Sequence, residues 1–169
     1  INLFGNTFSI TRFEDYLKSY KISYSLEDVY KILRALEDVF LVGYVKQYFK
    51  SHNKREISKS KVYLFDTSYI AFLSKESEDF GRILENLVFI ELFRRQDDIE
   101  NNSIFYYESD TKKQCDFIIK NKSSIEAIQV CYNLNEKSRE REVNGLLEAM
   151  EKFSLKKGLI LTHDQAEEI

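Results

Sequence analysis

The sequence predicts an α/β protein made of two modules that meet near residue 65. The 169 residues are 43% hydrophobic and 14% aromatic, which is enough apolar surface for a core and excludes a disordered chain. Residues 1–65 hold 11 basic and 7 acidic residues (net +4), and residues 66–169 hold 14 and 21 (net −7), which together give the net charge of −3. The order of elements also changes, from helices followed by a hairpin to a helix, three strands, a helix and a strand. Such a division indicates two modules, of which the basic one is the candidate for binding polyanions.

The composition also limits where the protein acts. No stretch approaches 18 apolar residues, and no secretory signal is present, so we expect a cytoplasmic protein without a membrane partner. Cys115 and Cys131 do not form a disulfide framework and are expected to be reduced structural thiols. Because the chain does not begin with Met, we expect a fragment of a longer protein, truncated also at the C-terminus of its second module.

The first module, residues 1–65, has the element order of a winged helix-turn-helix. Thr7 or Ser9 is placed to cap a first helix, and Ser25 with Asp28 forms a capping-box signal before a second one. The second helix carries apolar residues at helical spacing: Leu26, Val29, Tyr30, Leu33, Leu36 and Val39. Residues 40–49 are then predicted to form a strand that pairs with residues 62–65, and the connection between these strands is the wing.

The wing is the candidate nucleic-acid interface of this module. The helix over residues 26–37 carries more acidic than basic residues and is a poor recognition helix, because DNA binding depends on neutralising phosphates. The wing region is strongly basic, with a single acidic residue, Glu56. Two interpretations stay open, a wing that contacts phosphates and a solvated loop. The candidate residues are Lys46, Lys50, Lys54, Arg55, Lys59 and Lys61.

The second module, residues 66–169, is predicted to be a small α/β unit with a mixed sheet. A short helical link precedes a strongly apolar helix, and three strands, a charged amphipathic helix and a short buried strand follow. The predicted elements are a link over 66–73, a helix over 81–95, strands over 104–108, 115–120 and 125–134, a helix over 136–153 and a strand over 158–162.

Three segments of the chain resemble the C-terminal region of a family of bacterial and archaeal AAA+ ATPases. They are Gly81-Arg82-Ile83-Leu84-Glu85-Asn86-Leu87-Val88-Phe89, Cys115-Asp116-Phe117-Ile118-Ile119 and Ile128-Gln129-Val130. In that family an ATPase module precedes a winged helix and a restriction-endonuclease-like (PD-(D/E)XK-type) domain of unknown function. The resemblance implies that ATP and Mg²⁺ belong to an ATPase module outside this chain. The chain itself has no G-x-x-x-x-G-K-[ST] phosphate loop, so we expect it to bind no ATP and to hold no cofactor.

The resemblance also implies the positions of a nuclease site, which departs from the family pattern. Glu85 and Asp116 fall where the helix Glu and the first strand Asp are expected, but Gln129 and Cys131 replace the Glu and Lys of the next strand. Both replacements remove charge that Mg²⁺ binding and water activation require. We therefore expect this region to be non-catalytic. Glu85 and Asp116 would either bind a divalent ion weakly or form a structural polar cluster with Gln129.

The sequence thus predicts a nucleic-acid-binding accessory region with a degenerate nuclease-like domain. Two alternatives stay open. One is a module that docks a protein partner and binds no nucleic acid. The other is a metal-dependent nuclease with an atypical site.

Overall fold

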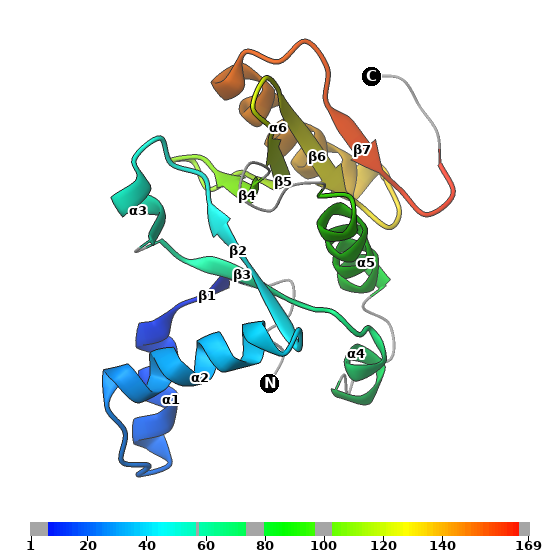
Figure 1. Ribbon diagram of the computed structural model, residues 1–169. Coiled ribbons are helices and arrows are strands. Elements are labelled where there is room, and N and C mark those ends of the chain that lie inside the picture. Colours follow the sequence, from blue (N-terminus) through cyan, green and yellow to red (C-terminus); the bar gives the residue numbers. More distant parts are fainter. Residues whose placement is uncertain (1–6, 57, 74–79, 97–102, 166–169) are drawn as a thin grey trace.

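The computed structural model describes residues 7–56, 58–73, 80–96 and 103–165 (Figure 1). In chain order the elements are β1 (Thr7–Phe8), α1 (Ile10–Ser19), α2 (Leu26–Asp38), β2 (Val42–Gln47), α3 (His52–Glu56), β3 (Ser60–Leu64), α4 (Ser68–Leu73), α5 (Phe80–Arg94), β4 (Ser103–Glu108), β5 (Gln114–Lys120), β6 (Ile125–Val130), α6 (Glu136–Phe153) and β7 (Leu159–Leu161). The mixed α/β class expected from the sequence is confirmed. Among the described residues, no helix has the length and apolar character needed to cross a bilayer.

The ends of helix α2 follow from local sequence. At its start the Ser25 hydroxyl accepts a hydrogen bond from the Asp28 backbone N–H, and the Asp28 carboxylate accepts one from the Ser25 N–H, as the capping box predicts. At its end Phe40 has a left-handed φ of 54°, and its N–H donates to the Glu37 carbonyl while Leu41 N–H donates to the Leu36 carbonyl. This pair of bonds is a Schellman cap. The prediction that the next strand begins at residue 40 is therefore wrong, because Phe40 and Leu41 end the helix.

One seven-stranded sheet runs through both predicted modules. Its strand order is β1-β3-β2-β4-β5-β6-β7, with parallel pairing between β2 and β4 and between β6 and β7. The pairing of β2 with β4 crosses the expected boundary at residue 65, and Tyr48 N–H extends it by donating to the Tyr106 carbonyl at 2.8 Å. The hairpin β2–β3 is therefore built into the larger sheet. The expected charged connection between its strands contains the short helix α3.

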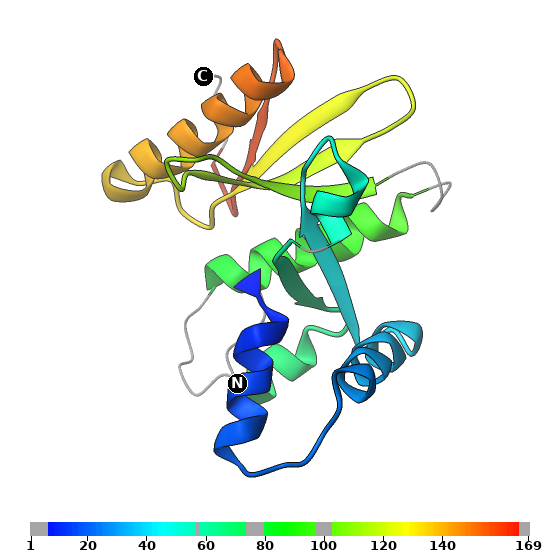
Figure 2. The ribbon, with the colours of Figure 1, turned by 90° about the vertical axis from the view of Figure 1, so that its left-hand side faces the viewer.

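Two helices cover opposite faces of the sheet, with α6 on one side of β4 and β5 and α5 on the other (Figure 2). Phe89 of α5 lies in one core cluster with Tyr63, Tyr106 and Phe117. The Tyr63 and Phe89 rings are stacked, with 4.7 Å between their centroids. On the other face, Leu146 and Ala149 of α6 are buried in a separate cluster. Helix α6 approaches β5 so closely that a Cβ on Gly145 would lie 2.0 Å from the Gln114 carbonyl oxygen, so only glycine fits there.

Candidate functional site

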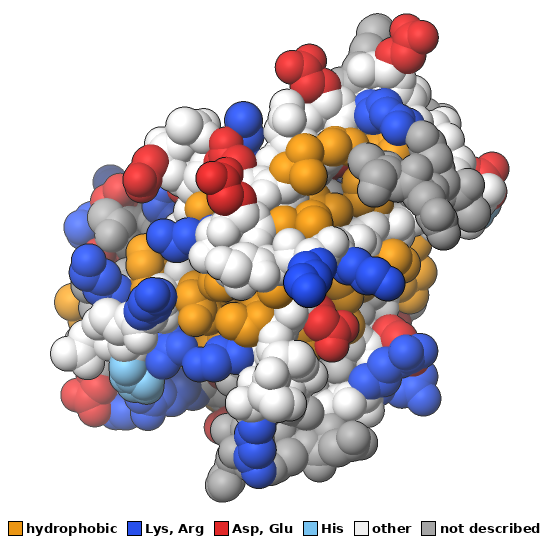
Figure 3. All heavy atoms as spheres, turned by 90° about the horizontal axis from the view of Figure 1, so that it is seen from above, with side chains coloured by type: hydrophobic (Ala, Val, Ile, Leu, Met, Phe, Trp, Pro, Cys, Tyr) orange, Lys and Arg blue, Asp and Glu red, His pale blue; other side chains and the backbone are white. Residues whose placement is uncertain are grey.

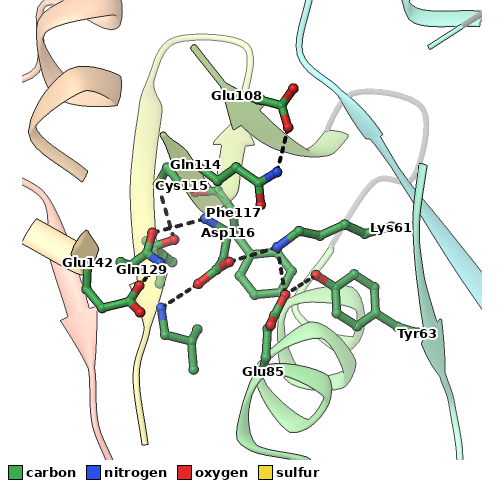
Figure 4. Close-up of polar contacts among 12 residues, drawn as sticks. Lys61, Tyr63, Glu85, Glu108, Gln114, Cys115, Asp116, Phe117, Gln129 and Glu142 are labelled. Atoms are coloured by element: carbon green, nitrogen blue, oxygen red, sulfur yellow. Dashed lines mark hydrogen bonds and ion pairs between the residues drawn. The ribbon is translucent and has the colours of Figure 1, made fainter. Parts of the chain in front are cut away.

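A cavity of about 530 Å³ opens where β3, α5, β5, β6 and α6 meet. The carboxylates of Glu85, Asp116 and Glu142 lie among its walls, together with the Lys61 ammonium group and the Gln129 amide. Figure 4 shows these side chains converging from different elements. The structure therefore brings together three of the four positions that the nuclease resemblance singles out, Glu85, Asp116 and Gln129.

Lys61 is the central cation of the site. Its Nζ donates to Asp116 Oδ1 at 2.8 Å and to Glu85 Oε1 at 2.9 Å, so one ammonium group bridges two carboxylates. Tyr63, two residues along the same strand, donates its hydroxyl to Glu85 Oε1 at 2.6 Å. This spacing follows from strand geometry, since residues i and i+2 lie on one face of β3. The Lys61 side chain is only 4% exposed, so these charges interact with little screening by water.

The pKa values of this cluster follow from burial and charge. Burial by itself would lower the pKa of Lys61, but the charges of Asp116 and Glu85 outweigh it and raise that pKa above its usual value. Burial and the neighbouring Asp116 charge raise the pKa of Glu85, against the opposing effect of Lys61. Burial, followed by the Glu85 charge, raises the pKa of Tyr63 well above its usual value. Lys61 therefore stays charged over the whole physiological range.

A bulge in β5 turns Asp116 toward Lys61. In the β4–β5 pairing, Phe105 lies opposite Ile118 and Tyr107 lies opposite Cys115. Between these two pairs the chain advances by three residues in β5 but by two in β4, so β5 contains one extra residue. The extra residue shifts the alternation of side chains at this point, which is how β-bulges redirect side chains near functional sites. A regular strand would have kept Asp116 on the same face as Ile118, which packs under α6.

The ends of β5 and β6 are joined by side chains where their ladder stops. The last ladder pair is Phe117↔Ile128. Beyond it, Asp116 N–H donates to Gln129 Oε1 at 3.2 Å, and Val130 N–H donates to Asp116 Oδ2 at 3.0 Å. Both carboxylate oxygens of Asp116 and the amide oxygen of Gln129 thus already have hydrogen-bond donors.

The neighbours of Gln129 explain why an amide stands there. Its Nε2 donates to Glu142 Oε2 at 2.5 Å, while its Oε1 accepts from the Asp116 backbone. Glu142 is 6% exposed and is also paired with the Arg141 guanidinium, whose Nε lies 2.9 Å from Glu142 Oε1. A carboxylate at position 129 would have no N–H for Glu142 and would bring a second negative charge beside it. The amide is therefore suited to a structural polar network.

Neither cysteine takes the place of the missing lysine. Cys131 lies just beyond β6, and its thiol donates to the Asn133 carbonyl at 3.2 Å. Cys115 is fully buried, and its thiol donates to the Ile128 carbonyl at 3.4 Å. Neither thiol is joined in a disulfide in the structure, and both are buried.

The residues present do not fit a divalent cation between Glu85 and Asp116. Mg²⁺ needs several oxygen ligands at about 2.0–2.1 Å, but the Lys61 ammonium lies between the two carboxylates at hydrogen-bond distance from each. Within the described ranges, no group of three or more His, Cys, Asp and Glu side chains is arranged to hold a metal ion. The structure thus has a polar cluster at Glu85, Asp116 and Gln129, organised around a lysine.

The predicted nucleic-acid-binding residues fall into three environments. Lys50, Lys54 and Lys59 are exposed around α3, whereas Lys46 and Arg55 are half-buried. The Arg55 guanidinium lies 5.4 Å from the centre of the Phe105 ring. Lys61 is 3% exposed and lies in the carboxylate cluster, paired with Glu85 and Asp116.

Three residues of the network were not predicted to take part in it. They are Lys61, Tyr63 and Glu142. The sequence places Lys61 only among the nucleic-acid-binding candidates and gives no signal for Tyr63, and their i, i+2 spacing is common to all strands. Glu142 lies in a helix whose alternating charges are typical of a solvated face, yet it is buried under Gln129.

Alkaline pH is expected to destabilise the fold. The pKa of Tyr106 and that of Cys115 are raised to about 12 by burial, and those of Tyr63 and Lys61 are also raised. In the unfolded chain these groups lose protons at pH values of about 8.5 (Cys) to about 10.4 (Lys). Since the unfolded state releases protons first, stability should fall as pH rises from about 9, by up to about 1.4 kcal/mol per pH unit for each group. Urea unfolding between pH 7 and pH 11 measures this decline.

A Tyr106→Phe variant is the control for this decline, because it removes one of the four groups and keeps the ring. Its stability should fall less steeply than that of the wild type above pH 10. A wild-type stability that stays constant up to pH 11 would contradict the expectation.

Comparisons with known proteins place the chain in a family. A family model described as "Domain of unknown function (DUF4143)" matches residues 80–168. The chain is 38% identical over 155 residues to an uncharacterized protein of Methanocaldococcus jannaschii, an alignment that covers 92% of this chain and 34% of that protein. The chain thus spans about a third of the length of this relative. No solved structure matches the chain. The chain belongs to the DUF4143 family, and its buried Lys61–Glu85–Asp116 cluster lies partly in the matched region.

Proposed function

We propose that this chain is a nucleic-acid-binding accessory region whose nuclease-like site is structural. Its binding surface is the basic surface around α3, formed by Lys46, Lys50, Lys54, Arg55 and Lys59. The interpretation of β2, α3 and β3 as the wing of a winged helix-turn-helix belongs to the same proposal. So does its association with an AAA+ ATPase module that supplies ATP binding elsewhere.

One observation carries the proposal: the exposed cations around α3 lie close together on the structure. Lys50, Lys54 and Lys59 are exposed at the ends of β2 and β3 and on α3 between them. Lys and Arg side chains gather at the left of Figure 3, the side on which α3 lies in Figure 1. Phosphate backbones bind to surfaces of this kind, because cations that neutralise phosphates release counterions.

The structure of the neighbouring residues also supports a phosphate-binding surface at α3. Both ends of the connection that contains α3 are anchored to β4, since Tyr48 N–H donates to the Tyr106 carbonyl and the Tyr106 hydroxyl donates to the Lys59 carbonyl at 3.3 Å. Arg55 packs over the Phe105 ring, which limits the motion of its guanidinium. Cations on a fixed scaffold lose less conformational freedom on binding than cations on a flexible loop.

Binding to a labelled random-sequence duplex at about 50 and 200 mM salt tests the proposal. Four phosphate contacts should weaken binding by roughly a hundred-fold between these salt concentrations. A variant with Lys50, Lys54, Arg55 and Lys59 changed to Ala should lose most of its affinity and most of its salt dependence. Fluorescence anisotropy measures both quantities.

The matched control removes four exposed charges from other parts of the surface, by changing Lys120, Lys122, Lys156 and Lys157 to Ala. This control has the same net charge as the wing variant, so a general charge effect would weaken both equally. Equal affinities of the two variants, or no duplex binding by the wild type at low salt, would refute the proposal.

A second candidate function is docking of a protein partner without nucleic-acid binding. The observation that favours it is a group of exposed apolar side chains on and beside α1 and α2: Tyr16, Tyr20, Ile22, Leu26, Tyr30, Ile32, Val39 and Phe40. Within this set the Tyr16 and Tyr20 ring centroids lie 4.9 Å apart, and Leu26 and Tyr30, four residues apart, share one face of α2. Contiguous exposed apolar side chains are typical of interaction surfaces. The duplex titration separates the two candidates, since this function predicts no salt-dependent DNA affinity.

A further inference from the structure

We propose that Lys61 is the built-in cation of the carboxylate pair Glu85–Asp116 and takes the position that a divalent metal ion would need. The wild-type site then binds no divalent cation, and loss of the Lys61 side chain creates a site that does. This inference concerns the cavity at β3, α5 and β5 and is independent of nucleic-acid binding at α3.

The geometry of the Lys61 ammonium carries this inference. The group bonds to one oxygen from each carboxylate, at 2.8 Å to Asp116 and 2.9 Å to Glu85, and therefore lies between them. Figure 4 shows Lys61 reaching this point from β3, while the two acids come from α5 and β5. Each acid is held from a second direction, Glu85 by the Tyr63 hydroxyl and Asp116 by the Val130 N–H.

The charge of the pair favours a cation between the two acids. The Glu85 and Asp116 side chains are 13% and 10% exposed, so without Lys61 two negative charges would face each other with little solvent screening. Hard cations such as Mn²⁺ and Mg²⁺ bind carboxylate oxygens, but they must approach at closer range than an ammonium group. The Lys61 side chain excludes them from the space between the acids, and the adjoining cavity of about 530 Å³ has room for the water ligands that a metal ion would bring.

Thermal unfolding with and without MnCl₂, against NaCl of equal ionic strength, tests the inference on the 169-residue chain. The Tm of the wild type should not respond to Mn²⁺. The Lys61→Ala variant should be less stable in NaCl and should gain roughly 5–10 °C when Mn²⁺ is about a hundred-fold above its dissociation constant. Isothermal titration calorimetry should show about one Mn²⁺ ion bound per Lys61→Ala chain.

Two further variants locate the effect. Lys61→Ala combined with Asp116→Asn removes one of the two charged ligands and should lose the response to Mn²⁺. Lys120→Ala removes an exposed lysine from the end of β5, the strand that carries Asp116, and should show the Mn²⁺ response of the wild type. If Lys61→Ala is unfolded in NaCl, recovery of its far-ultraviolet circular dichroism on addition of Mn²⁺ supports the inference.

Two results would overturn the inference. One is Mn²⁺ binding by the wild type that disappears in Asp116→Asn, which would show that metal and lysine share the site. The other is a Lys61→Ala variant that neither binds Mn²⁺ nor recovers structure with it, which would show that the acids do not form a cation site.

Discussion

Replacing Lys61 by Met is expected to destabilise the protein by about 3–5 kcal/mol, the usual cost of removing one partner from a buried ion pair. The side chain is 4% exposed and pairs with both Glu85 and Asp116. Met fills a similar volume but leaves two buried carboxylates without a cation. Urea unfolding at pH 7 measures the loss as a lower midpoint at an unchanged m-value.

A compensating variant shows that this loss comes from uncompensated charge. Lys61→Met combined with Glu85→Gln and Asp116→Asn removes all three charges and should recover a large part of the stability, because neutral replacements of a buried ionic cluster are often tolerated. The Lys59→Met substitution of an exposed lysine should change stability by less than about 0.5 kcal/mol. A triple variant as unstable as Lys61→Met would show that the cause is lost packing or hydrogen bonding.

Replacing Asn86 by Leu is expected to cost about 2–6 kcal/mol. Asn86 is 1% exposed, and its amide donates to the Leu64 carbonyl at 2.7 Å and accepts from the Leu64 N–H at 2.8 Å. Among the described residues, β1 pairs with β3 at Ser60 and Lys61, and at Leu64 the Asn86 side chain satisfies the backbone N–H and carbonyl. Leu would leave a buried donor and a buried acceptor without partners, at about 1–3 kcal/mol each.

The position of the loss can be measured as well as its size. In Asn86→Leu, hydrogen exchange should become faster at the Leu64 amide than the loss of global stability accounts for. At the amides of β5 and β6, exchange should become faster only by the amount that the lower global stability predicts. Leu87→Ala on the exposed side of α5 is the matched control, since Leu87 is 47% exposed. An Asn86→Leu protein as stable as this control would contradict the assigned role of Asn86.

Local patterns in the sequence determined most of the elements. The capping box at Ser25 and Asp28 and the apolar periodicity that follows it place α2 within a few residues of its observed bounds. The strongly apolar run over 81–95 does the same for α5. Helix α6 occupies the expected range, Glu136–Phe153. These signals depend on contacts between residues three or four apart in the chain, so the local sequence contains them. The strand ends were less accurate: β6 ends at Val130, because side chains of Asp116 and Gln129 replace its ladder there.

Part of the site was also predictable. The resemblance to the endonuclease-like family implied that Glu85 and Asp116 share one site with Gln129, and that two charges of the family pattern are missing at positions 129 and 131. It could not show that Lys61, 24 residues before Glu85 and 55 before Asp116, supplies the cation of that site. The tertiary structure decided this, because the Lys61 contact requires β3 and α5 to pack beside the bulge in β5. Bulges, strand order and contacts across many residues depend on the whole fold, and no local pattern encodes them.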